Sequence, residues 1–131
     1  MAKTMQFDLV SPERSLASLK ATAVQLPGSE GQMTVGPGHT PLITTLKPGM
    51  LTITGEAGTL SFAVTGGFAE ISEGSTTVLA ERAYERGPEA RAALETALAD
   101  ARAAADAAKG PEKDTAEMLV ADFVHLLADM Q

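Results

Sequence analysis

Residues 50–80 read MLTITGEAGTLSFAVTGGFAEISEGSTTVLA, and this stretch decides the fold class. It contains four short runs of apolar and β-branched residues, and each pair of runs is joined by a polar turn that contains glycine. Loops of about four residues between such runs are typical of antiparallel β-hairpins. The first predicted hairpin has strands at 50–54 and 59–65 joined by a turn at 55–58. The second has strands at 68–71 and 76–80 joined by a turn at 72–75.

Further runs of the same kind precede this stretch, and each of them ends at a turn that contains proline. They are residues 6–10, 21–26 and 42–46. The inward-facing candidates of the second run are Ala21, Ala23 or Val24, and Leu26. Many short strands with Gly/Pro turns, and no segment long enough for a crossover helix, indicate a sandwich or barrel instead of a parallel sheet. We therefore predict an all-β sandwich domain over residues 1–86.

The composition changes sharply at Arg86-Gly87-Pro88, after which alanine and charged residues dominate. Proline suits the first turn of a helix, because the N–H that it lacks would have no partner there. A second break, Gly110-Pro111, stops this first helix. Two helices joined by about four residues form an antiparallel hairpin. A two-helix hairpin is therefore predicted over residues 87–131.

Apolar residues recur at spacings of three and four in both predicted helices. In the first helix they are Ala90, Leu94, Ala97, Leu98, Ala101, Ala105 and Ala108. In the second, which begins at Pro111-Glu112 or at Asp114, they are Ala116, Leu119, Val120, Phe123, Leu126, Leu127 and Met130. Alanine buries little area, and stabilisation follows apolar area at about 25 cal/mol per Å². Two short helices with so narrow a seam are marginal alone, so we expect the hairpin to pack against the sandwich at rest.

Charge and composition exclude several classes of function. Seventeen acidic against ten basic residues give a formal net charge of -7, with no basic cluster to neutralise phosphates, so nucleic acid is not an expected partner. The same shortage of basic residues argues against an anionic lipid surface, and no direct lipid insertion is expected, since no stretch approaches the roughly 20 apolar residues of a membrane span. The chain has no cysteine, which excludes disulfides and Cys-based metal sites.

The sequence also lacks the marks of a catalytic, cofactor or metal site. His125 adjoins the apolar stripe of the last helix, which fits an ordinary residue at the flank of that stripe. His39 lies in a loop of turn-forming residues. Its side chain could equally make a functional polar contact or a structural hydrogen bond to the loop backbone. No glycine-rich loop ends in Gly-Lys-Ser/Thr, and no Gly-x-Ser-x-Gly occurs. Carboxylates such as Glu70 and Glu73 fit solvated strand and turn positions. The chain is predicted to be a binding or structural protein and not an enzyme.

Several segments resemble, in order, the epsilon subunit family of F-type ATP synthases over residues 5–84. They are 7–14 (FDLVSPER), 26–31 (LPGSEG), 36–42 (GPGHTPL), 46–50 (LKPGM), 64–71 (VTGGFAEI) and 78–83 (VLAERA). The resemblance implies a flattened sandwich of about ten strands followed by the helical hairpin. It also implies a non-catalytic rotor subunit that transmits proton-driven rotation of the membrane ring of c subunits to the catalytic head through the gamma subunit. Its place would be peripheral, on the cytoplasmic face of the bacterial plasma membrane.

The resemblance also implies contact residues. By position, the gamma-subunit contacts are Ser11, His39 and Thr44, and the membrane-ring contacts are Glu30, Gln32 and Met33. The family often has a carboxylate where this chain has Gln32, which removes one charge from the expected ring contact.

In some family members the hairpin reaches the alpha/beta catalytic head and inhibits ATP hydrolysis through basic residues on the second helix, or binds ATP through an Ile/Leu-Asp-x-x-Arg-Ala motif. This chain keeps Arg91-Ala92, but Pro88 occupies the position of the Asp. The second helix carries five acidic residues, Glu112, Asp114, Glu117, Asp122 and Asp129, against Lys113. Like charges would repel an acidic partner, so we expect neither ATP binding nor strong inhibition.

Two other functions have weaker support in the sequence. A free-standing β-sandwich module that binds a ligand such as a sugar would need exposed aromatic platforms, and the chain has one Tyr, four Phe and no Trp. A small hydrolase would have to use His39 as its base, with no nucleophile placed beside it by the sequence.

Overall fold

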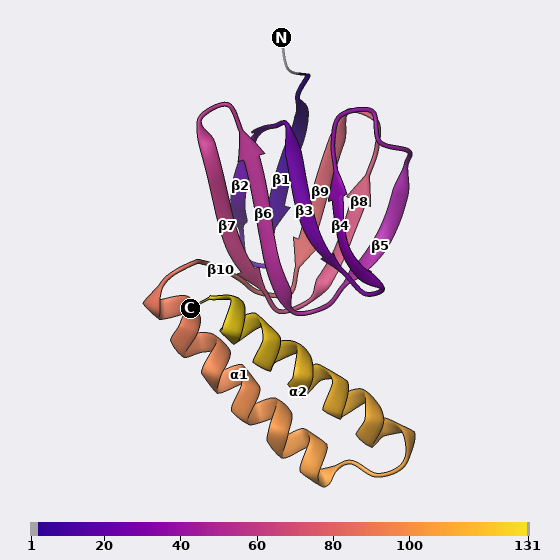
Figure 1. Cartoon of the computed structure of the whole chain (residues 1–131), viewed down its shortest axis with the longest axis vertical. Coiled ribbons are helices and arrows are strands. Elements are labelled where there is room, and N and C mark those ends of the chain that lie inside the picture. Colours follow the sequence, from indigo (N-terminus) through magenta and orange to yellow (C-terminus); the bar gives the residue numbers. More distant parts are fainter. Residues whose placement is uncertain (1–2, 131) are drawn as a thin grey trace.

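Ten strands occupy the first two thirds of the chain in the computed structural model, which describes residues 3–130 (Figure 1). They are β1 (Met5–Val10), β2 (Ser15–Ala21), β3 (Ala23–Gly28), β4 (Gly31–Val35), β5 (Leu42–Leu46), β6 (Gly49–Gly55), β7 (Gly58–Val64), β8 (Gly67–Ile71), β9 (Ser75–Ala80) and β10 (Ala83–Glu85). The predicted fold class, a sandwich of about ten strands followed by a helical hairpin, is confirmed.

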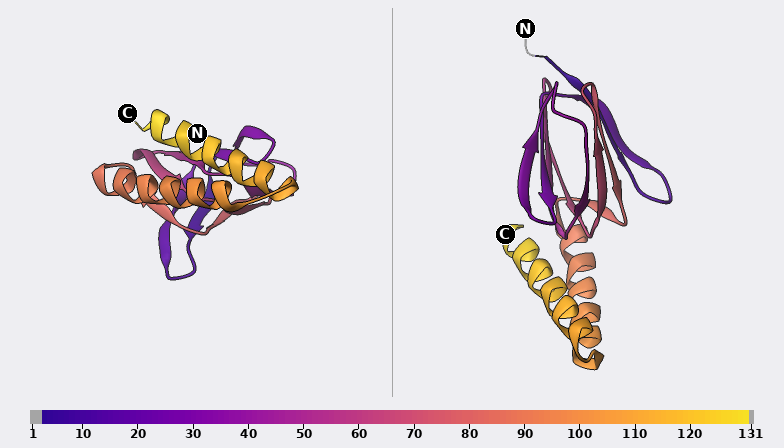
Figure 2. Two further views of the ribbon diagram at one scale, coloured as in Figure 1. Left: turned by 90° about the horizontal axis from the view of Figure 1, so that it is seen from below. Right: turned by 90° about the vertical axis from the view of Figure 1, so that its right-hand side faces the viewer.

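The strands form one continuous hydrogen-bonded sheet that folds into two layers. Its order is β10-β7-β6-β3-β5-β8-β9-β1-β2, with β4 paired to β3. The two layers are joined where β3 meets β5 through one residue pair, Gly28 with Leu46. One layer holds β10, β7, β6, β3 and β4, and the other holds β5, β8, β9, β1 and β2 (Figure 2). Most pairs are antiparallel, whereas β1 and β9 run parallel.

The core lies between the two layers and is built from alternate residues of the strands, as the period of two requires. Its largest fully buried side chains include Phe7, Leu9, Leu26, Leu51 and Ile53. The predicted inward candidates Ala21, Val24 and Leu26 are buried, which settles the choice between Ala23 and Val24 in favour of Val24. One buried hydroxyl, that of Thr76, donates to the Met5 sulfur at 3.3 Å.

Two helices follow the last strand, α1 (Pro88–Ala107) and α2 (Pro111–Asp129), and each begins with its proline in the first turn. The first helix ends before the predicted stop at Gly110, because Ala108 is already extended. Lys113 Nζ of α2 donates to the carbonyl oxygen of Ala105 at 3.0 Å, which satisfies a terminal carbonyl of α1. Among the described residues, neither helix is both long and apolar enough to cross a membrane. The division into two domains at residue 86 stays a prediction.

The hairpin contacts the sandwich where β6 begins and β7 ends, and both helices then run away from that end of the sandwich, so the predicted packing is seen at this junction only (Figure 1). Met50 and Ala63, a cross-strand pair, contact a second apolar cluster that contains Leu94, Phe123, Leu126 and Leu127. At the same junction, Arg86 Nη2 donates to the carbonyl oxygen of Asp129 at 3.1 Å.

One member of the predicted helical seam was placed wrongly. Leu119 is 39% exposed and lies beside the seam, not in it. Val120 and Phe123 fill the seam at that level instead, because the stripe on α2 runs through residues 116, 120, 123 and 127.

Candidate docking surface

Four neighbouring strands, β5, β8, β9 and β1, present their outer surface to solvent in two rows of side chains. The register places Thr45, Phe68, Leu79 and Val10 side by side in one row, and Ile43, Glu70, Thr77 and Asp8 in the next. Among these side chains Ile43 is 71% exposed, Phe68 46% and Leu79 36%. We call these eight residues the outer face of the second layer.

The exposure of these apolar side chains has a physical consequence. A soluble monomer seldom leaves large apolar residues side by side in water, and where it does so the patch often marks a binding surface. On the opposite layer, the hairpin covers the corresponding apolar residues Met50 and Ala63. The outer face of the second layer therefore has the character of a protein-docking surface.

The predicted gamma-subunit contacts lie along this layer, not in one cluster. Ser11 follows β1 at the end nearest the hairpin, where its N–H and hydroxyl donate to the Arg14 carbonyl oxygen. His39 lies at the far end, in the loop that precedes β5, where its Nδ1–H donates to the Thr40 carbonyl oxygen at 2.7 Å. Thr44 lies between them on β5. The contact role of all three stays a prediction.

The register of β5 separates Thr44 from its more exposed neighbours. Thr44 is half-buried and pairs with the buried Ala69, so its side chain shares the inner face with Leu42 and Leu46. Ile43 and Thr45 are the outward residues of this strand. The sequence reasoning missed Ile43, Phe68 and Leu79. The signal for them was the alternation in Phe68-Ala-Glu-Ile71, which left open whether the Phe68/Glu70 or the Ala69/Ile71 face would be buried.

The predicted membrane-ring contacts are close together, in the hairpin between β3 and β4. Glu30 is exposed in the turn and Gln32 is exposed at the start of β4, whereas Met33 is half-buried and packs against the core. These three residues lie close together because they are neighbours in the sequence. Their contact with the membrane ring stays a prediction.

Gln32 also lines a small cavity of about 240 Å³ between the sandwich and α2. Lys47, Asp122, His125 and Asp129 line the same cavity.

The chemistry that remains in the described residues is limited. Residues 3–130 contain no group of three or more His, Asp or Glu side chains that could hold a metal ion. His39 is committed to the backbone of its own loop, and His125 is exposed on α2. The main feature of the described residues is therefore a surface suited to binding, the outer face of the second layer.

Comparison with known proteins gives a consistent result. Residues 4–86 match the model of the ATP synthase delta/epsilon chain β-sandwich domain. The chain is 53% identical over 123 residues to the ATP synthase epsilon chain of Rhodobacter capsulatus, with 94% of this chain and 93% of that protein covered. It is 50% identical over 131 residues to the epsilon chain of Ruegeria sp. (strain TM1040), with coverage of 100% and 94%.

Solved structures show the same fold at lower identity. A chain in the Euglena gracilis mitochondrial ATP synthase (OSCP/F1/c-ring) superposes with a TM-score of 0.76 and 24% identity, covering 98% of this chain and 82% of that one. A chain in the central stalk and c-ring of the Tetrahymena thermophila mitochondrial ATP synthase gives a TM-score of 0.67 at 17% identity, with coverage of 97% and 96%.

Proposed function

The chain belongs to the family of ATP synthase epsilon chains, and from that premise we propose that it is a non-catalytic rotor subunit of the central stalk. In this role it couples proton-driven rotation of the c-subunit ring to the catalytic head through the gamma subunit. The observation that carries the proposal is the group of exposed apolar side chains on the outer face of the second layer, Ile43, Phe68 and Leu79. A subunit that transmits torque needs a large docking surface on a stiff support, and a paired sheet supplies that support.

Gamma is the partner we assign to this outer face. The two ends of the layer carry Ser11 and His39, so one partner lying along the strands would reach both. Thr44 lies between them, but its side chain shares the inner face, so it would take part only through its outward neighbours on β5. The exposed Ile43 and Phe68 lie within the same span and provide its apolar centre. Interfaces of this kind bind through a few central apolar or aromatic anchors surrounded by polar residues.

The ring of c subunits is the partner we assign to the hairpin between β3 and β4. Glu30 and Gln32 are exposed there and polar, and Met33 supports them from the core. As a subunit of a membrane-associated complex, the chain would then lie peripherally on the cytoplasmic face of the bacterial plasma membrane.

Replacing Ile43 with glutamate is expected to weaken binding to gamma about tenfold or more, because a carboxylate buried without a partner loses its hydration. The fold should be unaffected, since Ile43 is 71% exposed. The measurement is co-purification of the full chain with its cognate gamma subunit, followed by a binding titration. Met118→Glu on α2 is the matched control, because Met118 is 68% exposed and lies away from this face. If both variants bind as tightly as the natural chain, the outer face is not the gamma contact.

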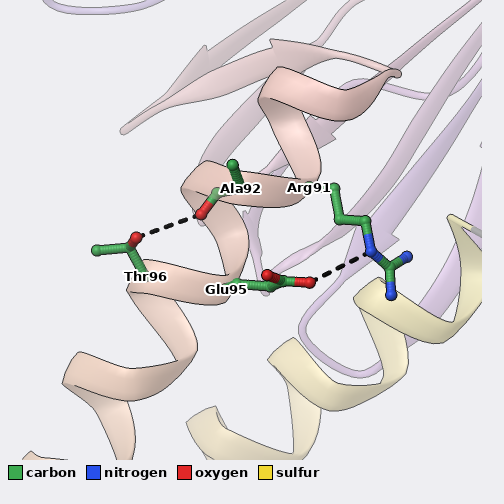
Figure 3. Close-up of polar contacts among 4 residues, drawn as sticks. All are labelled: Arg91, Ala92, Glu95 and Thr96. Carbon is green, nitrogen blue, oxygen red and sulfur yellow. Dashed lines mark hydrogen bonds and ion pairs between the residues drawn. The ribbon is translucent and has the colours of Figure 1, made fainter.

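The hairpin is proposed to be at most a weak inhibitor of ATP hydrolysis and to bind no ATP. Pro88 stands in the first turn of α1 where the ATP motif has an Asp, and Arg91 pairs with Glu95 on the same helix at 3.2 Å (Figure 3). On α2, Lys113 already contacts Glu117 and the end of α1. No basic surface is left on α2 for an acidic segment of the catalytic head.

Deleting residues 87–131 is therefore expected to leave the ATPase rate nearly unchanged in complexes that still contain the shortened chain. Steady-state ATPase assays of the purified complex provide the first readout. Calorimetric titration of the isolated full chain with ATP provides the second, and no submillimolar binding is expected. A severalfold rise in the rate after deletion, or clear submillimolar heat of binding, would show that the hairpin is regulatory.

A further inference from the structure

One methionine side chain dominates the sandwich side of the contact with the hairpin. Two sandwich residues belong to the apolar cluster at this junction, Met50 of β6 and Ala63 of β7, and they form a cross-strand pair. The hairpin side of the cluster includes Leu94, Phe123 and Leu126. Because an alanine side chain is a single methyl group, Met50 supplies most of the apolar area from the sandwich. Docking of the hairpin therefore depends strongly on this side chain.

Met50 also lines the cavity of about 240 Å³ between the sandwich and α2. Other walls of this cavity are polar, with Gln32, Lys47 and Asp122 among them. A cavity of this size with polar walls has the room and the hydrogen-bond partners that water molecules need. Met50 is accordingly half-buried, whereas Leu126 on the facing helix is fully buried. Small molecules that form hydrogen bonds as water does can therefore reach the Met50 side chain.

Hydrogen peroxide is such a molecule, and it oxidises a methionine thioether to the sulfoxide. The sulfur lone pair attacks one peroxide oxygen, so an S–O bond forms and the O–O bond breaks. The second oxygen leaves as hydroxide and takes the proton of the first to become water. The sulfur is oxidised by two electrons and the peroxide is reduced by two. The chain has no cysteine, so none of its own thiols competes for the oxidant.

Oxidation changes the surroundings that suit the side chain at position 50. A thioether packs well among apolar side chains, whereas a sulfoxide is polar and its oxygen accepts hydrogen bonds. The side chains of the junction cluster are apolar and offer no donor. The cavity offers two donors, the Lys47 ammonium and the Gln32 amide. The sulfoxide should therefore turn from the cluster into the cavity, which leaves Ala63 as the sandwich contribution to the cluster.

We propose that Met50 is a site of reversible oxidation by peroxide, and that its sulfoxide releases the hairpin from the sandwich. The hairpin suits this role, because two short helices with a narrow seam are marginal alone. Besides the cluster, the hydrogen bond from Arg86 to the Asp129 carbonyl oxygen fixes the hairpin at this junction. Reductases specific for the two sulfoxide epimers regenerate methionine, so the release is reversible. It involves residues of this chain alone and does not depend on the proposed function.

Peroxide treatment of the full chain, followed by peptide mass spectrometry and amide hydrogen exchange, tests this. We expect the sulfoxide at position 50, with protection about tenfold lower or more across α1 and α2 and unchanged in β3 and β8. In Met50→Leu the helices should stay protected after the same treatment, since leucine keeps the apolar volume and cannot be oxidised. Met118→Leu and Met130→Leu retain Met50, so their helices should lose protection as those of the natural chain do.

Several outcomes would overturn the proposal. One is equal loss of protection in peroxide-treated Met50→Leu and natural chain. Others are complete oxidation of the exposed Met118 with position 50 unoxidised, and the sulfoxide at position 50 with both helices still protected. Treatment of the oxidised chain with both reductases should restore protection, and a failure to do so once position 50 is again a thioether would also count against it.

A substitution gives a second readout without any oxidant. Met50→Gln places a polar side chain of similar length at the junction and should lower the protection of α1 and α2 about tenfold or more. Met118→Gln is the matched control, because Met118 is 68% exposed and its replacement should leave protection unchanged. Equal protection of the helices in the two variants would show that a polar group at position 50 does not release the hairpin.

Discussion

Replacing Gly67 with alanine is expected to destabilise the sandwich by about 3 kcal/mol or more, the sum of backbone strain and overpacking. Gly67 begins β8 with φ +137°, a conformation that side-chain-bearing residues rarely adopt. A Cβ atom there would overlap the Leu79 carbonyl oxygen and lie 3.0 Å from the Ala80 Cα. Both neighbours are backbone atoms of β9, which pairs with Gly67, so they have no rotamer by which to move away.

Thermal and denaturant unfolding of the full chain measures this effect, and a fall in Tm of about 10 °C or more is expected. Gly74→Ala is the matched control. Gly74 has no positive φ and open space around its Cα, so its substitution should change the unfolding free energy by less than about 0.5 kcal/mol. A Gly67→Ala variant as stable as the Gly74→Ala variant would show that the close approach of β8 and β9 is not needed for the fold.

The same region shows how far the sequence alone predicts this fold. The hairpins formed by β6 with β7 and by β8 with β9 were predicted with their turns, because apolar runs and glycine turns mark them directly. Three strands escaped prediction, namely β2, β4 and β10. β2 and β10 are at the ends of the strand order, and β4 lies outside it, paired to β3. Such strands bury fewer side chains, so their hydrophobic pattern is weak.

The candidate site was less predictable than the fold, for a physical reason. Alternation in a strand identifies two faces but does not identify which one is buried when both contain apolar residues. Phe68 is exposed although it is the largest side chain of β8, because the smaller Ala69 and Ile71 fill the core. The pairing of β1 with β9 joins residues far apart in the chain and completes the outer face, and no local pattern encodes it.

Replacing Leu126 with alanine is expected to release the hairpin from the sandwich without unfolding the sandwich. Leu126 is 1% exposed and belongs to the cluster that joins Phe123 and Leu127 to Ala63. Removing a buried leucine side chain costs about 2–5 kcal/mol. Little else fixes the hairpin to the sandwich besides this cluster and the hydrogen bond from Arg86 to the Asp129 carbonyl. The free energy lost with the Leu126 side chain should therefore exceed the free energy that holds the hairpin on the sandwich. Once released, the two helices should also lose order, because two short helices with an alanine-rich seam are marginal alone.

Amide hydrogen exchange on the full chain measures the release. Protection should fall across α1 and α2 and persist in β3, β6 and β8, whose hydrogen bonds belong to the sandwich. Met118→Ala on the same helix is the control, since Met118 is 68% exposed and its loss should leave protection unchanged. If Leu126→Ala lowers protection equally in the strands, the hairpin and sandwich unfold as one cooperative unit. The hairpin would then be a fixed part of the fold and not a detachable one.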